Sequence, residues 1–490
     1  MQVRTHNIFC ARRIHTICSN KFWTKIVKSC AFSGGISSFS DMVAKEKNFL
    51  SFRASNFDCT HLGKVALLGN GAVVVAASDR HAFNAIERQQ LEDIHAFVKS
   101  TVQHSSDAIA SNEPAANEDE EENAYVNIRG PVPESLCKWA SCLAVINPST
   151  GQKHILELEK NEAAFSVCVC SKALEHAAAE RFVVVGTAVG LQIHSRTAEK
   201  YFLLTYQFVP TTSELILVHR TSVENLPMCL MEFGNGRVLA GVGKTIRLYE
   251  IGLKQMLRKS ESKEFPSAVV RLDVHGSRIF VGDMSESVFL VKFKRTENAF
   301  IIFAEDVIPR WTSAICSLDH HTICGTDKFG NMFVMRAPEN ADEDVDGSTG
   351  ARILWDAGGR IQLSQECQYY QGEMMTSIHK MQFIAGGKDI LVAATLGGEL
   401  QAFIPLTSKG DLNFYTALET FLRTEMSFLC GRIHQSYRSY YQPVRHVLDG
   451  DLCALYATLP FSKQLAFAEE QGRTVPEVLK KLEEIRDIMA

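Results

Sequence analysis

The stretch from Ser277 to Arg336, SRIFVGDMSESVFLVKFKRTENAFIIFAEDVIPRWTSAICSLDHHTICGTDKFGNMFVMR, decides the fold of this 490-residue chain. It contains two strand pairs, residues 279–282 with 287–293 and residues 322–325 with 331–335. In each pair, a run rich in β-branched and aromatic residues meets a short turn and a second run that is apolar on both faces. Because both faces of such a strand must be buried, the pattern predicts antiparallel hairpins that are covered on each side by neighbouring sheets.

Related hairpins recur along the chain, beginning at Arg181, Gly236, Asp389 and, more weakly, Gly71. A small residue that closes the first strand marks the register at Gly186, Gly241, Gly282 and Gly325, which are 55, 41 and 43 residues apart. A four-stranded propeller blade repeats at about 40–45 residues. One blade cannot bury both of its faces alone, so blades stack around an axis to form a core. We therefore expect six blades, the last of which ends near Phe403 and Ile404.

Composition narrows the class of protein. A net charge of -5 with 22% charged residues lacks the basic surplus that is typical of nucleic-acid binding. No apolar run approaches the roughly 20 residues that span a bilayer. The 14 cysteines include no Cys-x-x-Cys pair, which favours buried thiols in a reducing compartment, the nucleus or cytosol, over zinc sites or disulfides.

Four segments depart from the blade pattern. Residues 1–50 carry basic residues and no acidic residue before Asp41; a mitochondrial transit peptide has this composition, but we favour an unassigned, disordered start. A helical-looking run, 87–100, and an acidic insert, 105–130, interrupt the first blade, and the insert has too little apolar surface to fold. A shorter acidic stretch from Pro338 interrupts the fifth blade. The propeller is thus expected to span residues 51–406.

The periodicity changes after Pro405, and residues 407–490 are expected to form a small α-helical domain. The stretches 411–426 and 474–489 place apolar residues on one side of a helix. Thr474 with Glu477 forms a capping box at the start of the second helix. The apolar faces need a partner, which is most simply the side of the propeller.

The sequence offers no catalytic, cofactor or metal site. Gly243-Lys244-Thr245 lacks the earlier glycine of a phosphate-binding loop and lies between two strands, so we predict a hairpin turn. His320-His321 has no further metal ligand at a useful interval and suits a turn between strands. No combination of nucleophile, base and oxyanion donor is recognisable.

The most unusual polar cluster is CGRIHQSYRSYYQPVRHVLDGDL, which begins at Cys430 and interleaves cationic with aromatic side chains. Such side chains stack on single-stranded RNA, and they also dominate protein–protein hot spots. A third interpretation is that the cluster is the corner that packs the helices against the propeller. The candidate contact residues are Arg432, His434, Tyr437, Arg438, Tyr440, Tyr441 and Arg445.

From residue 52 to the end, the chain resembles the C-terminal part of the triple-propeller family that includes damaged-DNA-binding protein 1, the largest cleavage and polyadenylation specificity factor subunit and a subunit of splicing factor 3b. The resemblance is strongest to the splicing branch. The segments that carry it are NEAAFSVCVC from Asn161, GRVLAGVGKTIRLYEIG from Gly236, KRTENAFIIFAEDVIPRW from Lys294, GTDKFGNMFVMRAP from Gly325 and CGRIHQSYRSYYQPVRHVLDGDLC from Cys430.

The resemblance implies a function without catalysis. It implies a nuclear scaffold subunit of splicing factor 3b in the U2 small nuclear ribonucleoprotein, acting in pre-mRNA splicing and branch-site recognition. The implied partners are a HEAT-repeat subunit and a small subunit, with at most weak or indirect RNA contact and no membrane, cofactor or small-molecule substrate. The alternative within the same family is a ubiquitin-ligase adaptor or a polyadenylation factor subunit.

The family's third propeller has seven blades, and chain from far upstream helps to close it. The resemblance therefore implies that this chain forms an incomplete propeller of the seven-bladed type, with an unpaired strand edge after Ile404. It also implies a fragment, a mis-started chain or one half of a split protein.

Overall fold

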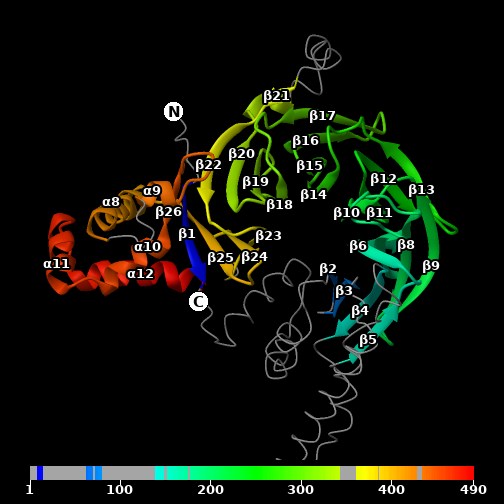
Figure 1. Ribbon diagram of the computed structural model, residues 1–490, viewed down its shortest axis with the longest axis horizontal. Helices are drawn as coiled ribbons and strands as arrows, with labels where there is room; N and C mark the ends of the chain where they lie inside the picture. Colours follow the sequence, from blue (N-terminus) through cyan, green and yellow to red (C-terminus); the bar gives the residue numbers. More distant parts are fainter. Residues whose placement is uncertain are drawn as a thin grey trace, which may run out of the picture. The chain divides into compact units, whose positions relative to one another are not determined.

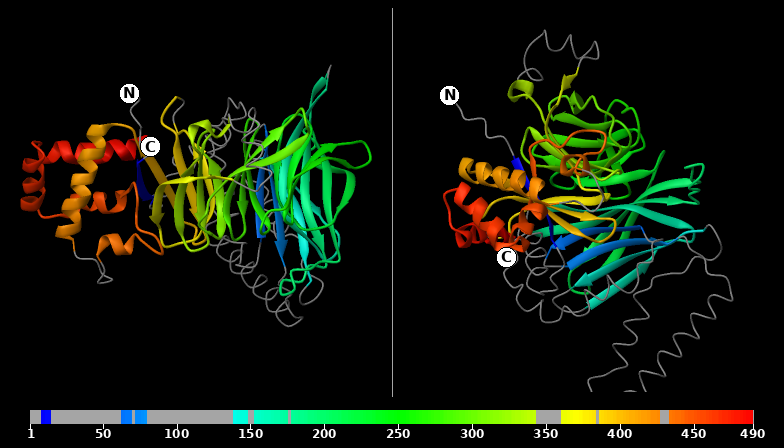
Figure 2. Two further views of the ribbon diagram at one scale, coloured as in Figure 1. Left: turned by 90° about the horizontal axis from the view of Figure 1, so that it is seen from above. Right: turned by 60° about the vertical axis from the view of Figure 1, so that its left-hand side comes forward.

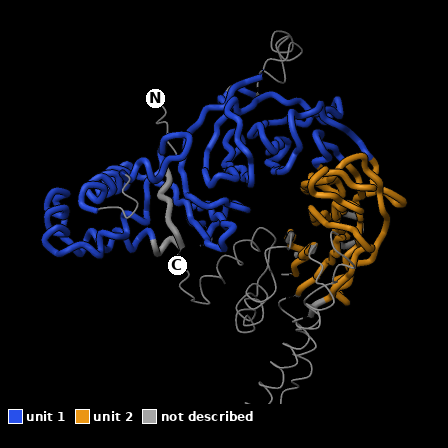
Figure 3. Tube along the Cα trace, in the orientation of Figure 1, with its two compact units in different colours: residues 1–39, 241–248, 258–490 blue, residues 40–240, 249–257 orange. Residues whose placement is uncertain are grey.

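The computed structural model of the chain is mainly β-strand, with helices gathered near the C-terminus (Figure 1). It describes residues 8–14, 62–69, 72–79, 138–147, 152–174, 177–342, 360–383, 386–426 and 433–489. The helical-looking run 87–100, the acidic insert 105–130 and Arg432 lie outside these residues. The chain divides into two compact units, coloured separately in Figure 3: residues 1–39, 241–248 and 258–490 form unit 1, and residues 40–240 and 249–257 form unit 2.

Unit 2 holds two four-stranded antiparallel sheets, each in sequence order. The first contains β2 (Leu62–Gly69), β3 (Ala72–Asp79), β4 (Ala140–Asn147) and β5 (Gln152–Glu157). The second contains β6 (Glu162–Leu174), β7 (Ala177–Val189), β8 (Lys200–Val209) and β9 (Glu214–Val223). The facing sides of both sheets share one core, to which Val74, Leu143 and Val185 belong. The predicted stacking of blades is present here.

The boundary between the units runs through a third sheet, also in sequence order. Its strands are β10 (Pro227–Glu232), β11 (Arg237–Val242), β12 (Thr245–Ile251) and β13 (Met256–Glu261). Gly243 and Lys244 join β11 to β12, and Gly243 has a φ of 56°, which glycine adopts without strain. The predicted hairpin turn at this tripeptide is confirmed.

Residues 277–336 supply most of the strands of two sheets in unit 1. One contains β14 (Val269–His275), β15 (Arg278–Asp283), β16 (Ser287–Lys294) and β17 (Ala299–Glu305), extended by β21 (Ile361–Gln362). The other contains β18 (Thr312–Ser317), β19 (Thr322–Asp327), β20 (Asn331–Arg336) and β22 (Ser364–Tyr370), and the short helix η2 (Glu339–Asp342) follows β20. Both predicted hairpins are confirmed. At Gly325 a Cβ atom would overlap the ring of Phe333, which explains why a small residue marks this register.

The last sheet corrects a prediction. It contains β23 (Met375–Met381), β24 (Ile390–Thr395), β25 (Leu400–Leu406), β1 (Ile8–Ile14) and β26 (Val447–Asp449). β1 pairs antiparallel with β25 from Ile8 opposite Leu406 to Ile14 opposite Leu400, and β26 pairs parallel with β1. The predicted unpaired edge after Ile404 is therefore wrong, and so is the expectation of disorder for residues 8–14. Backbone groups that the edge would leave unpaired gain partners from a segment at the other end of the sequence.

The helices of unit 1 pack against this last sheet, as Figure 2 shows. They are α8 (Lys409–Glu425), α9 (His434–Tyr437), α10 (Gly450–Ala454), η3 (Leu455–Thr458), α11 (Phe461–Glu470) and α12 (Val475–Met489). Leu418 and Val478 share a core with Ile404, so the predicted packing of helices on the blade side is confirmed. The backbone N–H of Thr474 donates to Glu477 Oε2 at 2.8 Å, as the capping box predicted. No helix in the described part of the chain is long and apolar enough to span a bilayer.

Several cysteines lie in the cores of these sheets. The thiols of Cys168, Cys170 and Cys324 are buried, and burial raises the pKa of each, that of Cys170 to about 12. A thiol with a raised pKa stays protonated and unreactive at neutral pH. These residues are core-packing thiols, as their positions in strand patterns indicated.

Candidate functional site

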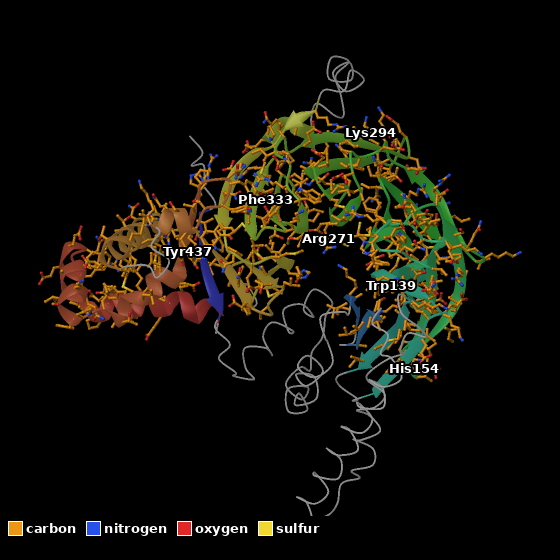
Figure 4. All side chains as sticks on the ribbon, viewed as in Figure 1. Trp139, His154, Arg271, Lys294, Phe333 and Tyr437 are labelled. Carbon is orange, nitrogen blue, oxygen red and sulfur yellow. The ribbon has the colours of Figure 1, made fainter. Side chains whose placement is uncertain are left out.

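The predicted contact cluster lies in unit 1, where the chain passes from α9 to β26. Figure 4 labels Tyr437 in this passage. Arg445 forms a bridge with Gln368 of β22: its N–H donates to the Gln368 carbonyl at 2.8 Å, and the Gln368 N–H donates back at 3.0 Å. The passage between the helices and the sheets is therefore fixed by backbone hydrogen bonds.

Two members of the cluster are buried around Asp449. His434 and Arg438 are 4% and 5% exposed. His434 Nε2 lies 2.8 Å from Asp449 Oδ2, and Arg438 Nε donates to the same oxygen at 2.6 Å. Asp449 Oδ1 accepts the N–H groups of Asp451 and Leu452, each at 3.1 Å, and so caps α10. Burial alone raises the pKa of Asp449, but the hydrogen bonds of His434 and Arg438 and the positive charge of Arg438 hold it at about 2.

A second carboxylate ties this group to α8. Glu419 Oε1 accepts the N–H of Asp449 at 3.1 Å and lies 3.0 Å from Arg423 Nη2. Arg423 Nε donates to His434 Nδ1 at 3.2 Å. His434 and Arg438 are therefore packing residues at the corner where the helices meet the sheets, and neither presents its side chain to solvent.

Two of the exposed members of the cluster, Tyr440 and Tyr441, are aromatic. Tyr440 is 56% exposed; its ring stacks on Tyr370 with centroids 5.5 Å apart, and it packs against Phe329 at 5.8 Å. Tyr441 is 44% exposed and donates its hydroxyl hydrogen to the carboxylate of Asp327. Burial and the neighbouring Asp327 raise the pKa of Tyr441, so its hydroxyl remains a donor at neutral pH.

Three residues from the β18–β20 region join these tyrosines and escaped the sequence analysis. Phe329 and Trp311 are each 40% exposed, and Lys328 Nζ lies 3.4 Å from the Trp311 ring centroid and 5.0 Å from that of Phe329. We call this set, Trp311, Lys328, Phe329, Tyr440 and Tyr441, the aromatic surface. Phe329 could have been noticed because it occupies a hairpin turn, where polar residues and glycine are usual.

The remaining candidates are held apart from this set. Tyr437 is 38% exposed, and the guanidinium carbon of Arg438 lies 5.0 Å from its ring centroid. Arg445 is exposed and is held by its backbone bridge to Gln368. The structure thus brings together Tyr440 and Tyr441 on the surface and, separately, His434 and Arg438 around the buried Asp449.

Buried polar groups fix the aromatic surface from below. Asp327 Oδ1 accepts the N–H groups of Phe329 and Asn331, each at 2.9 Å, which sets the turn that carries Phe329. Arg310, 1% exposed, donates to Asp306 Oδ2 at 2.9 Å and to Gln442 Oε1 at 3.3 Å. The second bond links the segment before Trp311 to the segment after Tyr441. A surface held in this way loses little conformational entropy when it binds.

The aromatic surface gathers partly exposed rings around one ammonium group. Within the described ranges, no group of three or more His, Cys, Asp or Glu is arranged to hold a metal ion. The Trp311 ring is covered by Lys328, and the Tyr440 ring by Tyr370. Four of the five members of the aromatic surface are aromatic, and Lys328 supplies one ammonium group.

Repeated antiparallel sheets, most with four strands in sequence order, and a helical region packed on the last of them define a propeller-type fold. The chain belongs to the family of the CPSF A subunit region, whose model matches residues 140–458. The family resemblance inferred from the sequence is confirmed.

Curated relatives place the chain within that family. It is 42% identical over 355 residues to "Splicing factor 3B subunit 3" of Danio rerio, a match that covers 71% of this chain and 29% of the relative. It is 38% identical over 355 residues to "Probable splicing factor 3B subunit 3" of Dictyostelium discoideum, covering 71% of this chain and 28% of the relative. It is 36% identical over 424 residues to "Spliceosome-associated protein 130 A" of Arabidopsis thaliana, covering 85% of this chain and 35% of the relative. The chain therefore spans about a third of the length of these proteins.

Proposed function

We propose that this chain acts in pre-mRNA splicing as a scaffold subunit of splicing factor 3b in the nucleus, without catalysis of its own. The observation that carries the proposal is the 36–42% identity to splicing factor 3B subunit 3 and spliceosome-associated protein 130 across most of the chain. The relatives named above are splicing proteins, which favours splicing over the ubiquitin-ligase and polyadenylation alternatives.

The aromatic surface is the proposed docking site for a protein partner. Tyrosine and tryptophan dominate protein–protein hot spots because they bury a large area at a small cost in side-chain entropy. RNA stacking requires open ring faces, whereas Tyr370 covers one face of Tyr440 and Lys328 covers Trp311.

The proposed partners are the HEAT-repeat subunit and the small subunit of splicing factor 3b. RNA contact through this surface is proposed to be weak or indirect, since Lys328 is its single cation. Arg438 is not a clean probe of either kind of contact, because its side chain is buried on Asp449 and its removal perturbs the fold.

The test compares the full chain with Tyr440→Ala and Phe329→Ala variants in nuclear extract. We expect each variant to recover the HEAT-repeat and small subunits at a level at least about tenfold below that of the unmodified chain, because loss of a hot-spot aromatic costs about 2 kcal/mol and 1.4 kcal/mol is about tenfold in affinity. Tyr437→Ala is the matched control: Tyr437 is exposed but lies outside the aromatic surface. RNA crosslinking should change little in all three. Undiminished recovery of both subunits would reject the surface, and loss of crosslinking without loss of subunits would assign it to RNA.

A further inference from the structure

Two turns at neighbouring sheets of unit 1 gather five basic side chains. The β14–β15 turn and the strands beside it carry His275, Arg278 and Lys292, and the β18–β19 turn carries His320 and His321. The His275 and His320 ring centroids are 6.0 Å apart, and those of His320 and His321 are 5.1 Å apart. We call these five residues the basic cluster.

Strand register places three of the five in one row. His275 lies opposite Arg278 in the β14–β15 pair, and Arg278 lies opposite Lys292 in the β15–β16 pair. Directly opposed residues of antiparallel strands project from the same face of the sheet. The register therefore gathers three basic side chains on one face of the sheet.

The two remaining histidines face the end of that row. Burial and then the charge of Arg278 lower the pKa of both His320 and His321. His275 and Lys292 lower the pKa of His320 further. Both rings are therefore mainly neutral at pH 7, and a bound anion would favour their protonated forms.

Two carboxylates beside the basic cluster, Asp273 and Asp319, hold its turns in place. Asp273 Oδ2 accepts the Ser317 N–H at 2.6 Å, which joins the two turns, and Asp319 Oδ1 accepts the His321 N–H at 2.7 Å. Glu339 raises the pKa of His321 less than Arg278 lowers it, and it lies 3.9 Å from Arg336. The turns are thus pre-organised while the side chains that gather on them are basic.

We propose that the basic cluster binds a single phosphate-type oxyanion, either inorganic phosphate or a phosphomonoester on a partner's serine or threonine. His275 is exposed and the rings of His320 and His321 are half-buried, so imidazole N–H groups can donate to the anion. Arg278 is 1% exposed, so it would attract the anion through its charge and not through direct contact. Its guanidinium carbon lies 4.6 Å from the Phe303 ring centroid.

The compactness of the cluster favours one anion over a nucleic-acid strand. A phosphodiester chain needs cations spread along a groove, whereas these five side chains come from two turns and a single cross-strand row. The proposal is independent of the aromatic surface, since the two sets share no residue. A negative result for the oxyanion site would therefore not affect the proposed docking role of the aromatic surface, and the reverse also holds.

The test uses the full chain with histidine ring protons observed by NMR. Sulfate is the first probe because it remains a dianion across the range studied; inorganic phosphate, a phosphoserine peptide and its unphosphorylated form follow. We expect sulfate to raise the pKa of His320 and His321 and to bind more tightly at about pH 5.5 than at about pH 7.5. If the ligand is the free anion, phosphate should compete with sulfate and the phosphoserine peptide should not. If the ligand is a phosphorylated side chain, both phosphate and the phosphoserine peptide should compete.

Variants locate the binding. Lys292→Gln and His320→Gln should each weaken sulfate binding about five- to tenfold, as expected for loss of one partly exposed charge or donor. His194→Gln, which removes an exposed histidine of unit 2, should leave it unchanged. Unaltered histidine pKa values at saturating sulfate, equal binding by all variants, or a preference for unphosphorylated single-stranded RNA over phosphate would each overturn the proposal.

Discussion

At the scale of single residues, Asp449 links three parts of unit 1. Its carboxylate contacts His434 and Arg438 from the segment after α8, caps α10 through Oδ1, and belongs to β26 in the last sheet. A buried carboxylate with a pKa of about 2 is stabilised as the anion by its neighbours. Its charge therefore contributes to the stability of the corner.

The first prediction at this scale concerns pH. The folded-state pKa of Asp449 lies below its value in an unfolded chain, so the charge stabilises the fold above about pH 4, and this stabilisation is lost as pH falls toward about 2. We expect Asp449→Asn to lower the free energy of unfolding by about 2 kcal/mol near pH 7, with a difference from the wild type that shrinks in acid. Urea unfolding at several pH values measures it, with the exposed Glu264→Gln as control. A deficit that stays constant down to pH 2 would show that the charge is irrelevant.

At the same scale, the cluster of residues 432–445 could be predicted from the sequence. Its division into exposed tyrosines and buried packing residues could not. Arg438 and Tyr440 are two residues apart in the same segment, yet Arg438 is buried and Tyr440 is exposed. The partners differ: Tyr370 stacks on Tyr440 and Asp327 accepts the hydroxyl of Tyr441, whereas Asp449 binds Arg438. Each of these partners comes from another segment of the chain. Such partners are set by tertiary structure, which local sequence patterns do not record.

At the scale of elements, hairpins were predictable and β1 was not. A hairpin carries its own signal, since both strands and the turn are contiguous, as in the pair β15–β16. β1 is short, contains Arg12 and Arg13, and finds its partner β25 at the opposite end of the chain. Nothing within seven residues specifies such a pairing, so the strand was interpreted as part of a disordered start.

The prediction at this scale tests β1 directly. Ala11→Pro places proline in a strand with neighbours on both sides, where the ring removes an N–H and clashes with the ladder. We expect amide hydrogen exchange in β25 and β26 to accelerate at least about tenfold, while β15 and β16 keep their protection. Gln2→Pro, upstream of β1, is the control. Unchanged exchange in β25 would mean that β1 does not cover that edge in solution.

At the scale of the whole molecule, composition bears on what the chain can bind. A net charge of -5 gives no long-range attraction for nucleic acid, and the aromatic surface contributes a single lysine. Association through this surface should therefore depend mainly on burial of aromatic and apolar side chains, which salt does not weaken.

Assembly through a surface with one cation should respond only weakly to salt. Between about 50 and 200 mM salt, the affinity of the full chain for the splicing-factor subunits should fall by less than about threefold, because counterion release contributes little to an interface with one exposed cation. An interface that neutralised 6–10 phosphates would lose roughly 10³–10⁵ in affinity over the same range. Lys328→Gln should flatten the remaining salt dependence further, whereas Lys244→Gln, in the β11–β12 turn, should leave the slope unchanged. Steep salt dependence that survives in Lys328→Gln would mean that a different, strongly basic surface carries the binding.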